Sequence, residues 1–135
     1  MPYNKLLPLL LLIVVVALAA AYTMSASDQG YRGISPQAAW ERLRSDEEII
    51  LIDVRTPEEY IQQRIPGAIL LPVAEIAQRA AEVMPAKDTV YFLYCRSGNR
   101  SAQAAALLVS MGYTKVFDMG GIIAWPYATV SGQPQ

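Results

Sequence analysis

One short segment holds the residues that could do chemistry. The segment CRSGNRS spans Cys95 to Ser101, and Cys95 is the only cysteine among the 135 residues. A thiolate is a strong nucleophile, and a thiol beside arginine loses its proton more readily than a free one. Arg96 and Arg100 carry permanent positive charge. The segment therefore predicts thiolate chemistry on a small anion.

The residues around this segment predict how it is held. The apolar run VYFLY precedes Cys95 and is typical of a buried strand, and AQAAALLVSMG follows Ser101 and is typical of a helix. A helix N-terminus carries partial positive charge, and Gly98 and Asn99 tolerate the left-handed backbone that turns successive N–H groups inward into an anion nest. We expect the pKa of Cys95 to lie below the free value of about 8.5. Cys95 is the predicted catalytic residue, with Arg96, Ser97, Gly98, Asn99, Arg100 and Ser101 as the predicted substrate-binding loop.

Composition excludes several other kinds of site. The chain has no histidine, which rules out Ser-His-Asp and Cys-His catalysis and most zinc, iron and copper sites. One cysteine cannot form an intrachain disulfide or a CxxC redox pair. We therefore expect no metal and no separate cofactor. The formal net charge is −1 and no basic run occurs, so no nucleic-acid partner is expected.

Two other interpretations of Cys95 remain at this point. The thiol could be a buried structural residue, since free cysteine often behaves as a small hydrophobic side chain. The loop could also bind an anion while the cysteine stays idle. The first interpretation is disfavoured because structural thiols lie within helices and strands, and Cys95 lies beside a Gly-Asn-Arg sequence.

The rest of the chain alternates strands with helices. Ser35-Pro36 and Thr56-Pro57-Glu58-Glu59 are typical helix starts. Strands are expected over 49–54, 68–71, 89–94 and 115–118, and helices over 36–44, from 56, 73–83 and 101–111, with a short last helix around Trp125. Ala102, Ala105, Ala106 and Val109 are expected to form the buried face of the long helix. The alternation predicts an α/β domain with a mostly parallel central sheet and helices on both faces, and its site at the carboxyl ends of the strands.

The N-terminal segment predicts export. Lys5 is followed by an uncharged run from Leu6 to Ser27, and an Ala-x-Ala pattern ends the most apolar part. This layout fits a signal peptide over residues 1–26, with an uncleaved membrane anchor as the alternative and a buried helix as the weakest interpretation. Either of the first two leaves the domain periplasmic or otherwise outside the cytoplasm. A linker is expected over 27–33, the domain over 34–128 and a flexible tail over 129–135.

The loop resembles the active-site loop of the rhodanese-like sulfurtransferases. The resemblance extends from residue 34 to 127 and includes IDVRTPEEY (52–60), IPGA (65–68), Gly112-Tyr113, and Gly120-Gly121 with Trp125. The family's second signature usually has a histidine just before IPGA, where this chain has Gln62-Gln63-Arg64. Asp53 and Arg55 could contact substrate at the rim of the site, but the preferred interpretation is an ion pair or hydrogen bonds that fix the strand end.

The resemblance implies a sulfurtransferase that carries sulfur as a persulfide on Cys95. Thiosulfate or a similar small anion would be the donor, held with the help of Arg96 and Arg100. The acceptor would be a thiol, such as that of a thioredoxin-like protein, or cyanide in an assay. A monomer is expected, and the membrane is a partner only through the N-terminal segment.

Two alternatives to this enzyme stay open. Rhodanese-like domains also occur as non-catalytic or redox-sensing modules, although inert members typically lack the cysteine that this chain keeps. Phosphatases with a similar loop place five residues between cysteine and arginine, whereas four separate Cys95 from Arg100. Arsenate reduction would also need resolving thiols, which the chain lacks. The shorter loop favours sulfur over phosphate.

Overall fold

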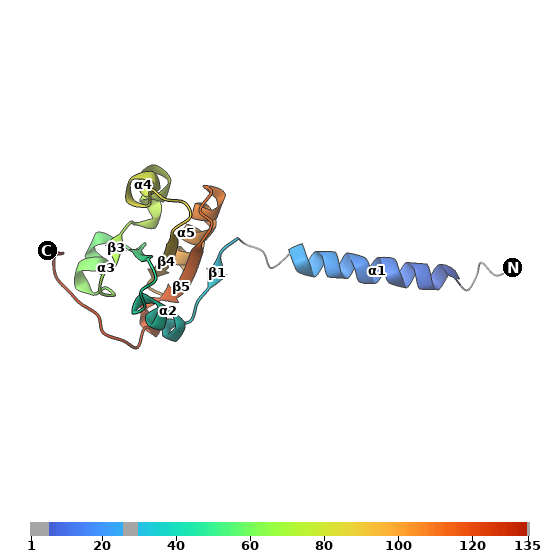
Figure 1. The fold of residues 1–135 in the computed structure, drawn as a ribbon, viewed down its shortest axis with the longest axis horizontal. Coiled ribbons are helices and arrows are strands. Elements are labelled where there is room, and N and C mark those ends of the chain that lie inside the picture. The colour runs from blue at the N-terminus through green and yellow to red at the C-terminus, as the bar shows by residue number, and fades with distance from the viewer. Residues whose placement is uncertain (1–5, 26–29, 135) are drawn as a thin grey trace.

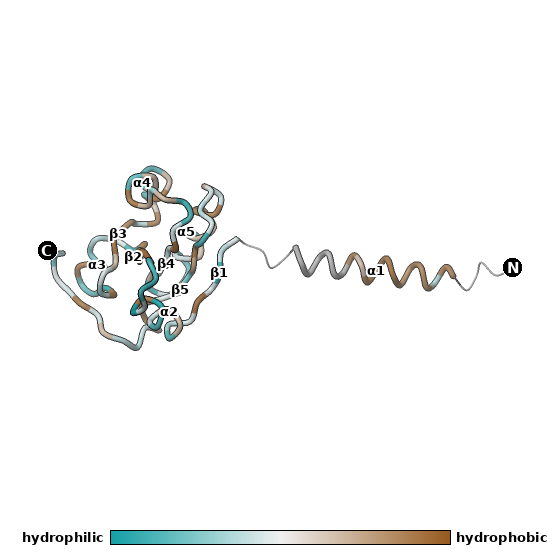
Figure 2. Tube along the Cα trace, viewed as in Figure 1, coloured by the Kyte–Doolittle hydropathy of each residue, from teal (hydrophilic) through white to brown (hydrophobic). Residues whose placement is uncertain are grey.

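The computed structural model of the chain describes residues 6–25 and 30–134 (Figure 1). The first element is α1 (Leu6–Ser25), which is strongly apolar from Leu6 to Leu18 (Figure 2). The side chains of these residues are exposed. No helix in the described part of the chain combines the length and hydropathy that crossing a membrane requires. The predicted signal or anchor covers residues 1–26, of which 1–5 and 26 lie outside the described residues. The predicted linker covers residues 27–33, of which 27–29 lie outside them.

The domain is built on a five-stranded sheet in which every pairing is parallel. The strand order is β1-β5-β4-β2-β3, and the strands are β1 (Arg32–Gly33), β2 (Ile49–Asp53), β3 (Ile69–Leu70), β4 (Val90–Cys95) and β5 (Val116–Gly121). This confirms the predicted α/β class. β1 was not predicted, and its two residues were expected in the linker, because a strand of two residues is too short to show an alternating pattern.

Alternation along β4 divides the core into two clusters. Tyr91, Leu93 and Cys95 face one cluster, and Phe92 and Tyr94 face the other. Successive side chains of a strand point to opposite faces, so a continuous apolar run indicates a strand that is covered on both sides. The helices accordingly lie on both faces of the sheet (Figure 1).

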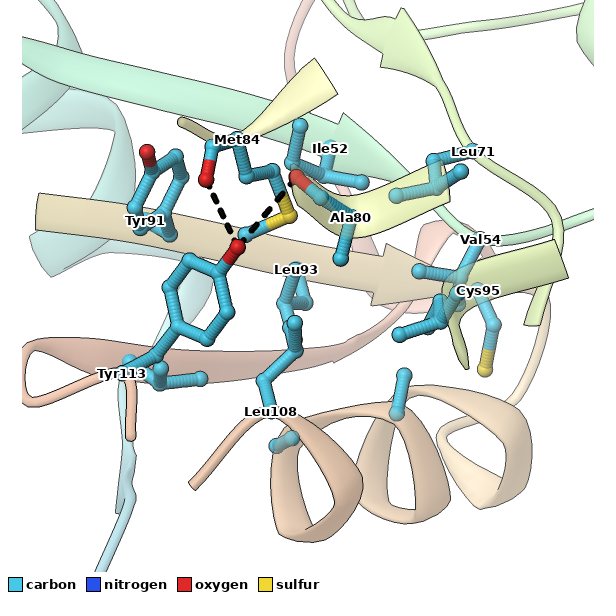
Figure 3. Close-up of a cluster of buried hydrophobic side chains, with 14 residues drawn as sticks. Ile52, Val54, Leu71, Ala80, Met84, Tyr91, Leu93, Cys95, Leu108 and Tyr113 are labelled. Atoms are coloured by element: carbon cyan, nitrogen blue, oxygen red, sulfur yellow. Dashed lines mark hydrogen bonds between the residues drawn. The ribbon is translucent and has the colours of Figure 1, made fainter. Parts of the chain in front are cut away.

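The first cluster packs α4 (Ile76–Val83) and α5 (Asn99–Ser110) against the sheet (Figure 3). The Tyr113 hydroxyl donates across this cluster to the carbonyl of Met84 at 2.6 Å and also lies 3.2 Å from that of Ala80. Cys95 lies at the edge of the cluster, next to Val54 (Figure 3). Cys95 is therefore held on one side by the core itself.

The second cluster packs α2 (Pro36–Leu43) and α3 (Pro57–Gln62) on the opposite face, through Ala39 and Tyr60. Both helices begin as predicted. The Ser35 hydroxyl accepts from the N–H of Ala38, and Thr56 forms a complete capping box with Glu59.

Two predicted helices differ from those observed. The segment predicted as one helix over 73–83 is a 3₁₀ turn, η2 (Val73–Glu75), followed by α4. The helix predicted from Ser101 begins two residues earlier, at Asn99. Its buried face is also different, because the side chains that point into the core are Ser101, Ala104, Ala105 and Leu108. The predicted buried face was therefore wrong in its position around the helix axis. Alanines occur on several sides of this helix, so they do not indicate which side is buried.

The C-terminal part of the domain contains a further difference. β5 runs through Gly121, where a turn was expected, and η3 (Ile122–Ala124) follows it. Val130 and Arg64 form an antiparallel bridge, with both N–H to carbonyl distances at 2.9 Å, and the Gly132 N–H donates to the carbonyl of Ile61 at 2.8 Å. The segment is thus attached to the domain through Gly132, and the expected tail is shorter than residues 129–135.

Candidate active site

Cys95 ends β4 with its thiol turned inward. The residue is only 1% exposed. Its Sγ accepts a hydrogen bond from the N–H of Gly98 at 3.0 Å and lies 3.5 Å from the Ser101 hydroxyl oxygen. The sulfur therefore sits inside the loop that joins β4 to α5, where donors converge on it.

These donors set the acidity of the thiol. Burial by itself would raise the pKa of the Cys95 thiol, because it disfavours the anion. The Ser101 hydroxyl and the backbone N–H groups of Ser101, Gly98 and Ser97 outweigh burial, so the pKa of Cys95 lies below its ordinary value. A histidine-free loop can thus supply a thiolate.

The shape of the loop depends on close backbone packing. Gly98 has a φ of 108°, a conformation that side chains disfavour, and it forms the N-cap of α5. Gly121 lies directly against the loop, and a Cβ atom there would fall 2.1 Å from the Arg96 carbonyl oxygen. That carbonyl accepts from the N–H of Ile123 at 3.2 Å. The end of β5 therefore supports the loop from beneath.

Arg100 points to α3. Its Nη1 lies 2.7 Å from Oε2 of Glu59, and its Nη2 lies 2.8 Å from Oε1. The hydrogen bonds from Arg100 outweigh partial burial and, with the Thr56 N–H, hold the pKa of Glu59 at about 2. Arg100 therefore fixes the loop to a helix start, and its charge is balanced within the protein.

The other predicted loop residues face solvent. Arg96, Ser97 and Asn99 are exposed. No acidic side chain in residues 6–25 and 30–134 forms an ion pair with Arg96. Asn99 is the first residue of α5, and among the described residues only glycines have positive φ, so Gly98 alone provides the left-handed turn. Arg96 is consequently the open positive charge of the loop.

Asp53 and Arg55 form a buried ion pair, as preferred from the sequence. Their side chains are 0% and 4% exposed, and Arg55 Nη2 lies 2.6 Å from Asp53 Oδ2. The Asp53 carboxylate also accepts from the Arg55 N–H at 3.0 Å, and the guanidinium donates to the carbonyl of Gln63. The pair fixes the end of β2 next to β4.

Arg64 lies in the segment before IPGA, where the sequence analysis noted the lack of the usual histidine, and its contacts are structural. It is 8% exposed, its guanidinium lies 4.6 Å from the ring centre of Tyr60, and Nη1 donates to the carbonyl of Gly132 at 2.6 Å. Arg64 thereby ties the C-terminal segment to the end of α3.

A hollow of about 730 Å³ opens beside the loop. Its lining includes Arg96 from the loop, Arg55 and Glu59 from the β2–α3 region, and Ile123 from η3. Cys95 is not part of this lining. The hollow therefore lies beside the loop, and the buried side chain of Cys95 does not contribute to its surface.

Sequence reasoning missed two residues that shape this site. Glu59 was recognised as part of a helix start, but nothing local links it to Arg100, 41 positions away. Gly121 was recognised as a turn residue, whereas its role is to leave room for the loop backbone. The Gly-Gly pair was a usable signal, because consecutive glycines often mark a close backbone approach.

Comparisons with known proteins agree with this architecture. The family model of the rhodanese-like domain matches residues 35–127. A sulfurtransferase of Allochromatium vinosum is 44% identical over 93 residues, which cover 68% of this chain and 85% of that protein. The thiosulfate sulfurtransferase PspE of Escherichia coli is 44% identical over 77 residues, 56% of this chain and 74% of that protein.

Solved structures give the same result. A rhodanese with anions from Escherichia coli superposes with a TM-score of 0.59 at 39% identity, over 62% of this chain and 99% of that one. A thiosulfate sulfurtransferase from Pseudomonas aeruginosa superposes with a TM-score of 0.69 at 26% identity, over 79% of this chain and 21% of that one. The chain therefore belongs to the rhodanese-like domain family, as a sulfurtransferase of the rhodanese type whose one matched domain carries one cysteine, Cys95.

Proposed function

We propose that this protein moves sulfane sulfur from thiosulfate, or a similar small anionic donor, to a thiol acceptor through a persulfide on Cys95. The observation that carries the proposal is the position of Sγ within the loop, 3.0 Å from the N–H of Gly98 and next to the Ser101 hydroxyl. A thiolate that is stabilised without histidine suits covalent catalysis by cysteine. The name of the relative PspE supports thiosulfate as the donor.

The first step loads the cysteine. The Cys95 thiolate attacks the outer sulfur of thiosulfate, a bond forms between the two sulfurs, and the bond to the sulfonate group breaks. Sulfite leaves with the electron pair of the broken bond. The product is a persulfide anion, which the same backbone N–H groups stabilise.

The second step discharges it. An acceptor thiolate, or cyanide in an assay, attacks the outer sulfur, and the electron pair of the breaking bond returns to Sγ of Cys95. The acceptor leaves as a persulfide, or as thiocyanate, and the thiolate is regenerated. No metal or separate cofactor takes part in this scheme.

The two arginines have different parts in this proposal. Arg96 is exposed and has no acidic partner among the described residues, so it attracts the anionic donor. The charge of Arg100 is balanced by Glu59, so Arg100 acts chiefly by fixing the loop. A direct contact of Arg100 with the donor stays a prediction of the sequence. Ser97, Asn99 and the backbone of the loop complete the donor site.

We further propose that the domain works outside the cytoplasm, in the periplasm or an equivalent compartment. The support is the sequence layout of residues 1–26, with one early lysine, an apolar core and small residues after it. A cleaved signal is the preferred form and an uncleaved anchor the alternative. An exported thiol meets oxidants, so a reducing partner, such as a small thiol or a thioredoxin-like protein, would keep Cys95 active. The enzyme is proposed to act as a monomer.

The test is intact mass spectrometry of the full chain before and after incubation with thiosulfate. The expected product is heavier by one sulfur, about 32 Da, returns to the starting mass with dithiothreitol, and does not form in Cys95→Ser. Thiocyanate formation from thiosulfate and cyanide should be lost in the same variant. A protein that gains no sulfur and forms no thiocyanate would contradict the proposal.

The intact mass of the protein purified from its own cells tests the proposed export, because it identifies the first residue of the chain. A chain that starts near Tyr22 would support a cleaved signal, and a chain that starts at Met1 in the membrane fraction would support an anchor. Full-length protein in the cytoplasmic fraction would contradict both.

A further inference from the structure

The pairing of β4 with β5 is irregular beside Cys95. Leu93 of β4 pairs with Asp118 of β5. The next pairing joins Cys95 to Gly121, so β5 has one residue more than β4 between the two pairings. Gly120 lies in this bulge, and its φ of 77° is in the left-handed region that favours glycine. Bulges are over-represented next to active sites, and this one lies where β5 meets the Cys95 loop.

Gly120 contacts the Cys95 loop through its backbone. Its carbonyl oxygen accepts from the Ser101 hydroxyl at 3.3 Å. The same hydroxyl oxygen lies 3.1 Å from the carbonyl oxygen of Gly98 and 3.5 Å from Sγ of Cys95. Ser101 is fully buried, so these neighbours determine where its hydroxyl oxygen lies. The Gly120 carbonyl is therefore one of the groups that hold the Ser101 hydroxyl beside the sulfur.

The side chain of Asp118 holds Gly120 in this position. Its Oδ1 accepts from the N–H of Gly120 at 2.8 Å. Aspartate commonly accepts from the backbone two residues further on, and the contact stabilises a turned backbone. Asp118 is half-buried and forms no ion pair within residues 6–25 and 30–134. Its carboxylate thus stabilises the bulge and does not balance a cation of the described chain.

The Ser101 hydroxyl has to serve Cys95 in both protonation states of the thiol. A hydroxyl has one hydrogen and two lone pairs, so it can accept from a thiol and donate to a thiolate. While Cys95 is protonated, the Ser101 hydrogen is directed to a glycine carbonyl. When the thiolate forms, that hydrogen turns to Sγ by rotation about the C–O bond alone. The protein therefore has to fix the position of the oxygen.

We propose that Asp118 is a positioning residue for the Cys95 thiolate: it fixes Gly120 in the bulge, and Gly120 fixes the Ser101 hydroxyl within reach of Sγ. The inference rests on the proposed function, because it concerns how the nucleophile of that reaction is formed. The charge of a carboxylate by itself disfavours a nearby thiolate. Asp118 consequently favours the thiolate through these hydrogen bonds and against its own charge.

Other charged groups near Cys95 stay the same in a comparison of Asp118 variants. The elements around the thiol carry three ion pairs and one exposed cation: Arg100 with Glu59, Asp53 with Arg55, Glu75 with Arg79, and Arg96. None of these groups forms an ion pair with Asp118 in the described part of the chain. Two neutral variants of Asp118 therefore differ in geometry and not in charge.

The experiment measures the rate at which iodoacetamide alkylates Cys95 in the full-length protein as a function of pH. Cys95 is the only cysteine, so intact mass follows the reaction. The midpoint of the profile follows the pKa of the thiol, and the plateau at high pH follows access to the sulfur. A merely looser loop would change the plateau, whereas the proposed role changes the midpoint. The assay needs no sulfur donor, so a failure of the proposed sulfur transfer would leave it readable.

Asp118→Asn and Asp118→Gln form the matched pair. Both remove the charge, but the amide oxygen of asparagine stays within reach of the Gly120 N–H, and that of glutamine is displaced by one carbon. We expect a higher midpoint in Asp118→Gln than in Asp118→Asn. At pH values below both midpoints, alkylation of Asp118→Gln should be about two- to tenfold slower, which corresponds to one hydrogen bond. Asp118→Ala should resemble Asp118→Gln.

Two further variants show whether the effect is specific. Asp46 is exposed and lies between α2 and β2, so Asp46→Ala should keep the profile of the wild type. Ser101→Ala removes the hydroxyl that Asp118 is proposed to position. In the Ser101→Ala background, the Asp118→Asn and Asp118→Gln proteins should therefore have the same midpoint, because residues that act through one another are not additive.

Three results would overturn the inference. One is an equal midpoint in Asp118→Asn and Asp118→Gln. Another is a lower midpoint in Asp118→Gln, which would mean that the Gly120 carbonyl competes with the thiolate for the Ser101 hydrogen. The third is a difference that persists in full in the Ser101→Ala background, because the bulge would then act without Ser101. If Asp118→Ala does not fold, the matched pair decides, and if Asp118→Gln does not fold, Asp118→Ala replaces it.

Discussion

Arg100 and Glu59 join the catalytic loop to the start of α3 through two parallel hydrogen bonds of 2.7 and 2.8 Å. The same Glu59 oxygen that accepts from Arg100 Nη1 also accepts from the N–H of Thr56 at 3.0 Å. One carboxylate thus closes a capping box and holds an active-site arginine. A change at Glu59 should therefore affect both the stability of the protein and the geometry of the loop.

The first prediction concerns the pH dependence of this contact. Glu59→Gln should lower the free energy of unfolding at pH 7 by about 1–2 kcal/mol, because a hydrogen-bonded ion pair becomes a weaker neutral contact. The pKa of Glu59 is lowered to about 2 in the folded protein, from 4.5. A carboxylate whose pKa is lower in the folded than in the unfolded protein stabilises the fold at pH values above the unfolded pKa. This stabilisation is lost as the pH falls from the unfolded pKa of 4.5 to the folded pKa of about 2.

Urea unfolding at several pH values, followed by circular dichroism, measures the effect. The difference between wild type and Glu59→Gln should be full at pH 7 and should shrink as the pH falls from about 4.5 towards 2. A difference that stays constant over this range would show that the ion pair is not its source. Exposed Glu58, which forms no ion pair in the described residues, offers the matched control Glu58→Gln.

The second prediction concerns Ser101 and the acidity of the thiol. The Ser101 hydroxyl and N–H lower the pKa of Cys95 against the effect of burial. Ser101→Ala should therefore raise that pKa and reduce the thiolate fraction at neutral pH. The rate of alkylation by iodoacetamide, measured as a function of pH, should shift to higher pH.

Ser110 provides the control on the same helix. Its hydroxyl donates to the carbonyl of Leu107 at 2.6 Å and is exposed. Ser110→Ala should leave the pH profile of alkylation in place. Identical profiles in Ser101→Ala and the wild type would mean that the backbone N–H groups alone set the acidity of Cys95.

The third prediction concerns Gly121. Its φ of −109° is open to any residue, so an added Cβ acts by steric contact alone. That atom would fall 2.1 Å from the Arg96 carbonyl oxygen. Gly121→Ala should push the loop outward, cost about 1–3 kcal/mol of stability and slow persulfide formation.

Gly33 is the matched glycine in the same sheet. An added Cβ at Gly33 would meet nothing within 4 Å. Thermal unfolding and thiosulfate loading of Gly33→Ala should therefore stay close to the wild type. Full activity of Gly121→Ala would show that the loop tolerates a displacement at this point.

The fourth prediction concerns the attachment of residues 129–132, called the strap here, which bridge to Arg64 and Ile61. Arg64→Ala removes the hydrogen bond to the Gly132 carbonyl and the stacking on Tyr60. The amides of Val130 and Gly132, which donate to Arg64 and Ile61, should then exchange with deuterium faster than in the wild type. Amides of β4 should keep their protection, and the control Arg79→Ala should leave the strap protected. Unchanged exchange at Val130 and Gly132 would show that the backbone bridge holds the strap without the side chain.

Much of the fold could be predicted because its signals are local. The continuous apolar run before Cys95 indicated a strand covered on both faces, and Ser35 and Thr56 marked the starts of two helices. The buried face of α5 could not be predicted in the same way. Several of its sides carry small apolar residues, and only contact with the sheet selects the one that is buried.

The candidate site also combines features with a local sequence signal and features that only tertiary contacts produce. The sequence by itself predicted the class of enzyme, the candidate nucleophile Cys95 and the loop that lowers its pKa, because a strand, a glycine turn and a helix start are adjacent in the chain. Only the tertiary structure decided that Glu59 holds Arg100, that Gly121 supports the loop and that Thr129, Val130 and Ser131 line the hollow beside it. Those contacts join residues far apart in the sequence. They depend on the strand order of the sheet, which no local pattern encodes.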